Sequence, residues 1–200
     1  LLPIKANSER IVGKNFKNFN GKPLFYWVLN SLIGIKEISK IIINTDAEKN
    51  LFEDKIIESS KIILRKRKSE ICGDFVSINK ILKDDILSCK ENSFLMTHTT
   101  NPLVSKDTFI NVINKFKSRD KTKYDSLFTV NKIQTRFYDK NTKAINHNIS
   151  ILERTQDLEP WYEENSNIYL FTKESFLKND NRIGDLPIMF ETPPLESFDI

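Results

Sequence analysis

Residues 1–15 read LLPIKANSERIVGKN, a short apolar run followed by a loop that holds cations, a hydroxyl group and a glycine. The run Leu1–Ile4 is typical of a buried strand, and the polarity changes abruptly at Lys5. In open α/β sheets, the loops that follow the carboxyl ends of strands bind ligands. We therefore take this stretch as the first strand and first ligand-binding loop of an α/β fold.

The rest of the chain alternates short β-branched runs with helix-like segments, which is typical of a sheet covered by helices. The expected strands are Leu1–Ile4, Lys40–Thr45, Lys61–Leu64, Ser93–Thr97, Ser126–Val130 and Asn167–Phe171. The expected helices are Pro23–Leu32, Ala47–Ser60, Phe75–Leu87 and Lys106–Phe116. Two hundred residues fit one domain. The pattern predicts a single α/β domain over residues 1–200, built on a mainly parallel sheet flanked by helices.

One polar stretch, Gln134–Glu164, interrupts the alternation with clusters of Asn, Asp and Thr around the apolar fragment Ile149–Leu152. It is consistent with a hairpin or arm inserted into the sheet, and equally with a long surface loop.

Four polar, turn-rich segments each follow an expected strand: Lys5–Asn15, Asp46, Arg67–Ser77 and His98–Asn101. The carboxyl ends of parallel strands meet at one edge of a sheet, so these segments are expected to converge there. That edge is the predicted functional site.

Composition excludes several classes of protein. The net charge is only +4, from 31 basic and 27 acidic residues, which suits an anionic substrate and gives little support for nucleic-acid binding. The apolar runs are too short to cross a bilayer, and no secretory signal is visible. Cys72 and Cys89 are too few for a disulfide framework or a zinc site. We expect a cytoplasmic protein with reduced thiols and neither a nucleic-acid nor a membrane partner.

The first loop has the chemistry that a nucleoside triphosphate requires. Lys5, Arg10 and Lys14 supply positive charge, Ser8 a hydroxyl group, and Gly13 freedom for the backbone to approach a phosphate. The order of residues is not that of a Walker A loop. A solvated basic loop is the alternative, although three of the chain's five glycines lie in or near the segments after strands.

The runs Leu2–Lys5, Gly13–Asn15 and Asn20–Leu24 resemble the N-terminal signature of the acylneuraminate cytidylyltransferase family. That signature has a proline, a basic residue and a serine, then Gly-Lys-Asn and a Gly-Lys-Pro-Leu turn. The resemblance implies a Rossmann-like nucleotidyltransferase fold. It also implies an enzyme that joins CTP to an acidic sugar with the help of Mg²⁺.

Four later segments resemble the family in the same order: Asn44–Asp46, Arg67–Ser77, Thr97–Leu103 and Glu164–Tyr169. They are similar to its Ser-Thr-Asp strand end, its Arg…Asp-x-x-Ser segment, its Gln-Pro-Thr-Ser-Pro-Leu loop and the strand after its dimerisation arm. The resemblance therefore runs essentially from end to end.

The resemblance also implies roles for individual residues. Lys14 would be the principal charge-stabilising group at the reacting phosphate, and Arg10 would help to stabilise the leaving pyrophosphate. The residues implied to contact the nucleotide are Lys5, Ser8, Asn15, Asp46, Arg67, Asp74 and Ser77. Those implied to contact the sugar are His98, Thr100 and Asn101, and Asp199 would bind Mg²⁺. The arm at residues 134–164 would be a dimerisation element, so a homodimer is expected.

Several of these residues are also consistent with purely structural roles. Asp46 and Asp74 are suitable helix caps, and Ser77 would then lie in the first turn of a helix. Arg67 is one of four consecutive basic residues, and His98 could be a hydrogen-bonded structural histidine.

Three positions depart from the family pattern. Glu9 stands where many members carry a lysine, and His98 replaces a glutamine. The family's metal-binding Asp-x-Asp begins here at Asp199, with the second aspartate expected at position 201. Mg²⁺ prefers few protein carboxylates together with phosphates and waters, so one aspartate is compatible with binding.

The predicted function is activation of a sialic acid-like keto-sugar acid with CTP, giving a CMP-sugar and pyrophosphate. The alternatives are a Kdo or other sugar nucleotidyltransferase and a catalytically inactive nucleotide-binding homologue. A nucleic-acid-binding domain rests only on the basic pI and the run Arg65–Lys68.

Overall fold

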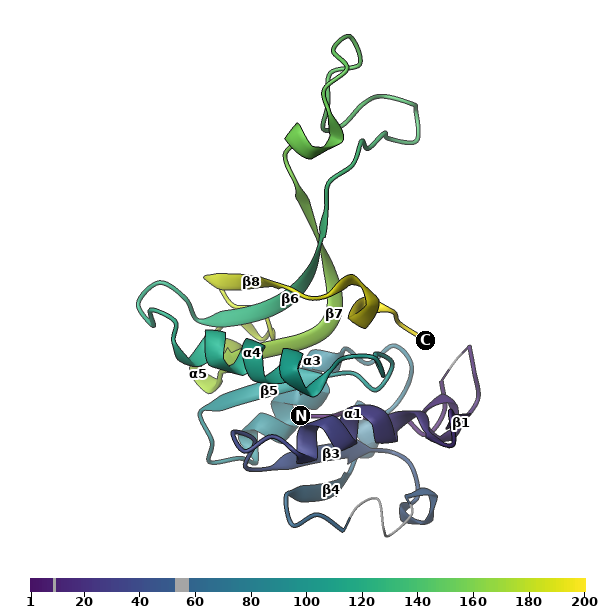
Figure 1. The fold of residues 1–200 in the computed structure, drawn as a ribbon. Helices are drawn as coiled ribbons and strands as arrows, with labels where there is room; N and C mark the ends of the chain where they lie inside the picture. Colours follow the sequence, from purple (N-terminus) through teal and green to yellow (C-terminus); the bar gives the residue numbers. More distant parts are fainter. Residues whose placement is uncertain (9, 53–57) are drawn as a thin grey trace.

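The computed structural model describes residues 1–8, 10–52 and 58–200, and the statements below refer to these residues. Its main strands are β3 (Ile41–Thr45), β4 (Ile62–Lys66), β5 (Ser93–Thr97), β6 (Ser126–Ile133), β7 (Trp161–Thr172) and β8 (Pro187–Glu191). β3 pairs in parallel with β4, and the other four lie in the order β5-β7-β6-β8 (Figure 1).

The segment 1–4 lies between these two groups of strands. Leu2 and Ile4 donate their backbone N–H groups to carbonyls of β3, each over 2.9 Å. On the other side, Thr97 of β5 donates its N–H to the carbonyl of Leu1 over 3.3 Å. The N-terminal segment therefore joins the two groups into one sheet and lies near its centre.

The sheet is mixed, which corrects the prediction of a mainly parallel one. β7 runs antiparallel to both of its neighbours, β5 and β6, whereas β6 pairs in parallel with β8. A parallel return needs a crossover connection, usually a helix. Since the described chain between β6 and β7 forms no such crossover, β7 comes back in the opposite direction.

Within the described residues, four helices cover the sheet: α1 (Leu24–Ile33), α3 (Ile78–Leu87), α4 (Lys106–Lys117) and α5 (Lys173–Asn179). Alternating side chains of β7 enter two separate cores. Ile168 and Leu170 belong to the core that includes residues of α1 and α4, whereas Tyr169 and Phe171 belong to the core beneath α3 and α5. This alternation follows from the two-residue period of a strand and explains why β7 is apolar on both faces.

Short elements complete the described chain. They are η1 (Lys14–Phe16), β1 (Asn18–Phe19), β2 (Lys22–Pro23), η2 (Lys49–Leu51), η3 (Ser69–Ile71), η4 (Thr155–Asp157) and η5 (Pro194–Ser197). A helix is expected over Ala47–Ser60. The structure has η2 within this range, and residues 53–57 lie outside the described residues. No helix in the described part of the chain is both long and apolar enough to cross a membrane.

Residues 134–160, between β6 and β7, project from the body of the protein as an arm (Figure 1). The arm has contacts of its own. Phe137 stacks on Trp161 with ring centroids 5.1 Å apart, and Gln134 donates its side-chain N–H to the Leu158 carbonyl over 2.7 Å. The segment has little regular structure: η4 and one isolated bridge between Tyr138 and Ala144.

Candidate active site

The first loop, Lys5–Asn15, is held in place by a buried amide at its end. Asn15 is only 7% exposed; its Nδ2 donates to the Lys5 carbonyl over 2.8 Å, and its Oδ1 accepts from the Thr99 hydroxyl over 2.6 Å. Gly13 has φ +66°, a left-handed conformation that favours glycine, and it begins η1. One amide thus joins both ends of the loop to the segment that follows β5.

The two predicted catalytic cations lie on this loop. Lys14 is half-buried in η1, and its Nζ donates to the Ile200 carbonyl over 2.6 Å. Ile200 in turn donates its N–H to the Thr100 carbonyl over 3.0 Å. Arg10 is exposed and Ser8 half-buried, whereas Glu9 lies outside the described residues. Lys14 therefore sits where the first loop, the 98–101 segment and the C-terminal segment meet.

Two of the predicted nucleotide residues contact the first loop directly. Asp46, at the end of β3, accepts the backbone N–H of Ala6 over 2.8 Å. Asp74 forms an ion pair with Lys5 at 3.1 Å, with both side chains partly exposed. Ser77 is the N-cap of α3, accepting the Asn79 N–H over 3.3 Å, which is why that helix begins at Ile78 rather than near residue 75.

Arg67 lies beneath the loop rather than on its surface. Its side chain is 1% exposed, and its Nη2 donates to the carbonyls of Ile4 and Asn44 over 3.1 and 2.9 Å. Burial lowers the pKa of its guanidinium, with Asp46 opposing the shift. Arginine stays charged even so. In this structure the group binds strand ends instead of facing solvent.

A polar cavity of about 340 Å³ is lined in part by the 98–101 segment and the C-terminal segment, the two segments that meet the first loop at Lys14. Its lining residues are His98, Thr100, Asn131, Glu163, Glu164, Asn165, Ser166, Ser197 and Asp199. The cavity brings together two of the three predicted sugar residues and the predicted metal ligand. Asn101, the third, is 1% exposed, and neither polar atom of its amide has a hydrogen-bond partner among the described residues.

A large irregularity in β7 shapes the wall of this cavity. Residues 165–168 stand opposite Thr129 of β6, and Ser166 has φ +58°, in the left-handed region. The Thr129 hydroxyl donates to Asn165 Oδ1 over 2.7 Å and accepts the Ile168 N–H over 3.0 Å. Bulges of this kind redirect side chains. Here the irregularity brings Asn165 and Ser166 to the cavity.

Glu164 on the same wall is fixed by two neighbours. The Tyr169 hydroxyl donates to its carboxylate, and Arg182 Nη2 lies 3.6 Å from Glu164 Oε1. The Arg182 guanidinium also lies over the Tyr169 ring at 3.9 Å and donates to its hydroxyl over 3.0 Å. Burial and the bond to Glu164 raise the pKa of Tyr169 to about 12, so the phenol remains a donor at neutral pH.

His98 is uncharged at neutral pH. Burial lowers its pKa to about 4, and the nearby cations Arg182 and Lys14 act in the same direction, against the opposing charge of Asp199. At pH 7 its imidazole therefore has one donor nitrogen and one acceptor nitrogen. It can hydrogen-bond to hydroxyl groups of a ligand without repelling a cation.

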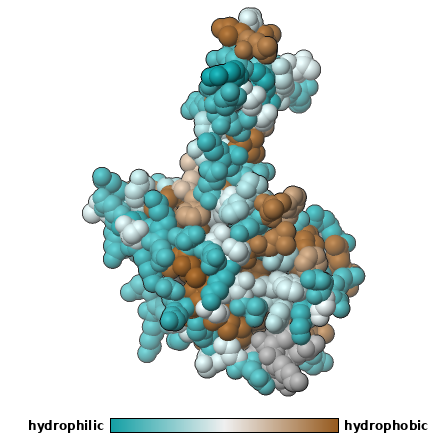
Figure 2. Space-filling model, viewed as in Figure 1, coloured by the Kyte–Doolittle hydropathy of each residue, from teal (hydrophilic) through white to brown (hydrophobic). Residues whose placement is uncertain are grey.

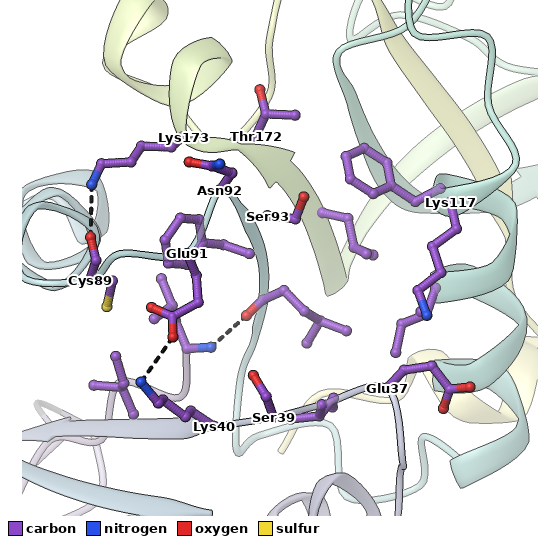
Figure 3. A pocket seen from close by; sticks show the side chains of 18 of the residues that line it. Glu37, Ser39, Lys40, Cys89, Glu91, Asn92, Ser93, Lys117, Thr172 and Lys173 are labelled. Atoms are coloured by element: carbon purple, nitrogen blue, oxygen red, sulfur yellow. Dashed lines mark hydrogen bonds and ion pairs between the residues drawn. The ribbon is translucent and has the colours of Figure 1, made fainter.

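A larger cavity, of about 650 Å³, lies at the opposite edge of the sheet (Figure 3). Its lining includes Ile41 and Ser93, the first residues of β3 and β5, and it is bordered by the Lys40–Glu91 ion pair at 2.9 Å. None of the predicted site residues lines it. Because ligands of open α/β sheets bind at the carboxyl ends of strands, the smaller cavity is the candidate active site.

Sequence reasoning missed several residues around the site. Asn44 and Asp85 are buried and hydrogen-bonded to one another, and Glu164 and Arg182 form the cavity wall described above. The sequence does indicate Asn44 as unusual, because it is the one polar residue in the otherwise apolar run 41–44. It gives no such indication for Arg182, because this residue comes from a loop whose position depends on the whole fold.

A sequence model of the family described as cytidylyltransferase matches residues 1–199. The chain belongs to this cytidylyltransferase family. Among individual relatives, an N-acylneuraminate cytidylyltransferase of Streptococcus agalactiae is 24% identical over 184 residues, covering 89% of this chain and 44% of the relative. A pseudaminic acid cytidylyltransferase of Campylobacter jejuni is 22% identical over 188 residues, covering 90% of this chain and 80% of the relative. The chain thus spans less than half the length of the streptococcal protein.

The fold of this cytidylyltransferase family member is similar to the folds of solved structures. A CMP:2-keto-3-deoxy-manno-octonic acid synthetase complexed with CTP matches with a TM-score of 0.65 and 12% identity, covering 96% of this chain and 88% of that one. A 4-diphosphocytidyl-2C-methyl-D-erythritol synthase of Anaerococcus prevotii matches with a TM-score of 0.63 and 13% identity, covering 100% and 88%. At these identities the likeness concerns the fold alone.

Proposed function

We propose that this chain transfers a cytidylyl group from CTP to an acidic keto-sugar of the sialic acid type, releasing pyrophosphate. The observation that carries the proposal is the meeting of the first loop, Asp46 and the 98–101 segment at one edge of the sheet, in a chain of the cytidylyltransferase family. The names of its relatives, which include sialic and pseudaminic acid cytidylyltransferases, support the sugar class.

In this proposal the first loop binds the triphosphate. Lys14 and Arg10 offset the negative charge that builds up on the phosphates as pyrophosphate leaves. Lys5, Ser8 and Asn15 position the nucleotide, with Asp46, Asp74 and Ser77 on the facing segments. Lys5 exchanges its ion pair with Asp74 for a phosphate; the exchange costs little because exposed ion pairs are weak. Arg67 contributes from below by holding the strand ends.

The polar cavity takes the sugar. The hydroxyl groups of the sugar donate hydrogen bonds to Glu163 and Glu164, and they both donate to and accept from His98 and Thr100. Asn101 is the third proposed sugar residue, and its buried amide has no hydrogen-bond partner among the described residues. The anomeric hydroxyl attacks the α-phosphorus in line, the bond from that phosphorus to the oxygen bridging to the β-phosphate breaks, and pyrophosphate leaves while the hydroxyl proton passes to water. The chain contributes mainly positioning and charge stabilisation.

Mg²⁺ is the proposed cofactor, and Asp199 is its proposed ligand. Asp199 is exposed at the cavity beside His98, and the described residues contain no cluster of three or more acidic, His or Cys side chains that could hold a metal by themselves. A lone carboxylate fits Mg²⁺, which keeps several waters and takes substrate phosphates as further ligands. When bound, the ion would neutralise phosphate charge.

We also propose that the arm, within residues 134–164, pairs two copies of the chain as a homodimer. Figure 2 shows hydrophobic residues gathered at its tip. The exposed aliphatic side chains among the described residues of the arm are Ile145, Ile149, Ile151 and Leu152, the last of them 91% exposed. Apolar groups this exposed commonly mark interaction surfaces.

The direct test is release of pyrophosphate from CTP, UTP, GTP and dTTP with a panel of eight- and nine-carbon keto-sugar acids. We expect release with CTP and one class of nine-carbon acid. Lys14→Ala should abolish it, whereas Lys17→Ala, an exposed cation just after η1, should not. If the protein prefers an eight-carbon acid or another nucleotide, the proposed substrate is wrong and the preferred one takes its place. Binding of CTP with no release for any acid would favour a non-catalytic nucleotide-binding protein.

A further inference from the structure

A chain of three buried polar residues runs from α3 through β3 to Arg67, directly after β4. Asp85 in α3 is 1% exposed, and its Oδ1 accepts from Asn44 Nδ2 over 2.8 Å. Asn44 is fully buried, and its Oδ1 accepts from Arg67 Nε over 2.9 Å. Arg67 itself is 4% exposed. We call Asp85, Asn44 and Arg67 the buried relay.

The relay ends at the first loop. Arg67 Nη2 donates to the Ile4 carbonyl over 3.1 Å, directly before the loop begins. Its Nη1 has no hydrogen-bond partner among the described residues and lies 4.0 Å from Asp46 Oδ1, the same oxygen that accepts the Ala6 N–H over 2.8 Å. Arg67 thus hydrogen-bonds to the backbone directly before Lys5 and lies near the carboxylate that binds the Ala6 N–H, and Asn44 and Asp85 connect it to a helix on the far side of the strand.

Stability alone does not explain this arrangement. Burial raises the pKa of Asp85, against the opposing effects of Asn44 and Arg65, so keeping its charge costs free energy. Replacing a whole buried ionic network with apolar residues of similar volume is often neutral or stabilising. The hydrogen bonds within a buried network do, however, hold the groups that they join in one geometry.

We propose that Asp85 is a positioning residue for nucleotide binding, because through Asn44 and Arg67 it fixes the backbone of Lys5 and Ala6. The proposal rests on the proposed function of the first loop. Asp85 itself does not touch the nucleotide. Its effect is on where the loop's N–H groups and the Lys5 side chain stand before the ligand arrives.

Two substitutions of Asp85 separate geometry from charge. In Asp85→Asn the amide oxygen can take the place of Oδ1, which accepts from both Asn44 and Arg65, and the amide nitrogen that of Oδ2, which has no hydrogen-bond partner among the described residues. Asp85→Leu removes every side-chain hydrogen bond while keeping the branched shape and the number of side-chain heavy atoms. Asp84→Ala is the matched control, since its ion pairs go to Arg65 and Lys68, both at 2.6 Å, and not to Asn44.

The first readout needs no ligand: the amide signal of Ala6 in ¹H–¹⁵N spectra and the rate of its hydrogen exchange. The second is the Kd for CTP, measured apart from kcat. Asp85→Leu should move the Ala6 signal, speed its exchange and weaken CTP binding about tenfold, equivalent to about 1.4 kcal/mol. Asp85→Asn and Asp84→Ala should leave the Ala6 signal in place and the Kd within about threefold.

An unchanged Ala6 signal and Kd in folded Asp85→Leu would overturn the proposal, as would equal effects of Asp84→Ala. If Asp85→Leu does not fold, Asn44→Ala takes its place, with the same expected displacement of Ala6. A wild-type protein that does not bind CTP would reject the proposed function, while the Ala6 signal in the ligand-free variants would still test the relay.

Discussion

Individual buried polar side chains determine the shape of the candidate site. Asn15, Arg67 and Thr99 each spend their hydrogen bonds on other parts of the protein, and each is less than 10% exposed. Leaving one partner of such a bond unsatisfied costs more than the bond itself contributes. Substituting any of them should therefore lower the stability of the fold as well as weaken ligand binding.

Asn15→Ala is expected to destabilise the protein by about 1–3 kcal/mol, because it leaves the Lys5 carbonyl and the Thr99 hydroxyl without their partner. Urea denaturation measures the loss. Thr99→Val removes the other end of one bond, so the double variant should cost less than the sum of the two single ones. Additive costs would show that the two side chains do not depend on one another.

His98 predicts a pH dependence of stability. Its folded pKa of about 4 lies below the ordinary 6.5, so between these values the unfolded chain binds more protons than the folded one. Stability is therefore full above pH 6.5 and falls as the pH is lowered toward 4, by at most about 1.4 kcal/mol per pH unit from this group. In His98→Gln, the midpoint of denaturation should depend less on pH between pH 4 and 6.5 than it does in the wild-type protein. An unchanged pH profile in that variant would contradict the prediction.

The sequence predicted which segments carry the site better than it predicted what each residue does. Lys5, Asp46, Asp74 and Thr100 were placed at one edge by a rule about strand ends, which needs only the order of elements. Whether a side chain on such a segment faces solvent depends on rotamers and on packing from distant elements. Arg67 turns inward for that reason, to carbonyls that no local pattern reveals.

Among the secondary-structure elements, β7 determines both the topology of the sheet and the cavity wall. Its reversed direction and the irregularity at 165–168 arise from how the chain leaves and rejoins the sheet. The sequence indicated a strand only over Asn167–Phe171, where both faces are apolar. The preceding part, from Trp161, is polar, and its sequence favours the arm. The sequence does not indicate α5, which has only seven residues, or β8, which begins with a proline.

Ser166 holds a left-handed φ of +58° within β7, which costs a non-glycine residue about 1–2 kcal/mol. Ser166→Gly should therefore be neutral or slightly stabilising, despite losing the hydroxyl that Tyr169 contacts at 3.3 Å. Ser166→Val should be destabilising, because β-branched residues tolerate this conformation least. Thermal unfolding compares the two. Ser93→Val, at an exposed strand position, is the control and should cost little.

For the whole molecule, the arm carries the proposal of a dimer. Wild-type protein at micromolar concentration should have the mass of two chains in light scattering, and the double substitution of Ile149 and Leu152 by Asp should give a monomer, because it places charge in the apolar surface. Leu186→Asp, an equally drastic change at an exposed leucine outside the arm, should remain dimeric. A monomeric wild-type protein would show the proposal to be wrong.

The segment 1–4, which joins the two groups of strands, has a consequence for synthesis of the protein. This segment is translated before its two neighbours, β3 and β5, and β5 ends only at residue 97. The centre of the sheet therefore stays open until β5 has been made. Contacts between such distant residues are slow to form and leave strand edges exposed meanwhile. A nascent chain halted before β5 would lack one of the two strands that hold segment 1–4, and with it the framework of the first loop. Such a chain would expose strand edges that chaperones bind.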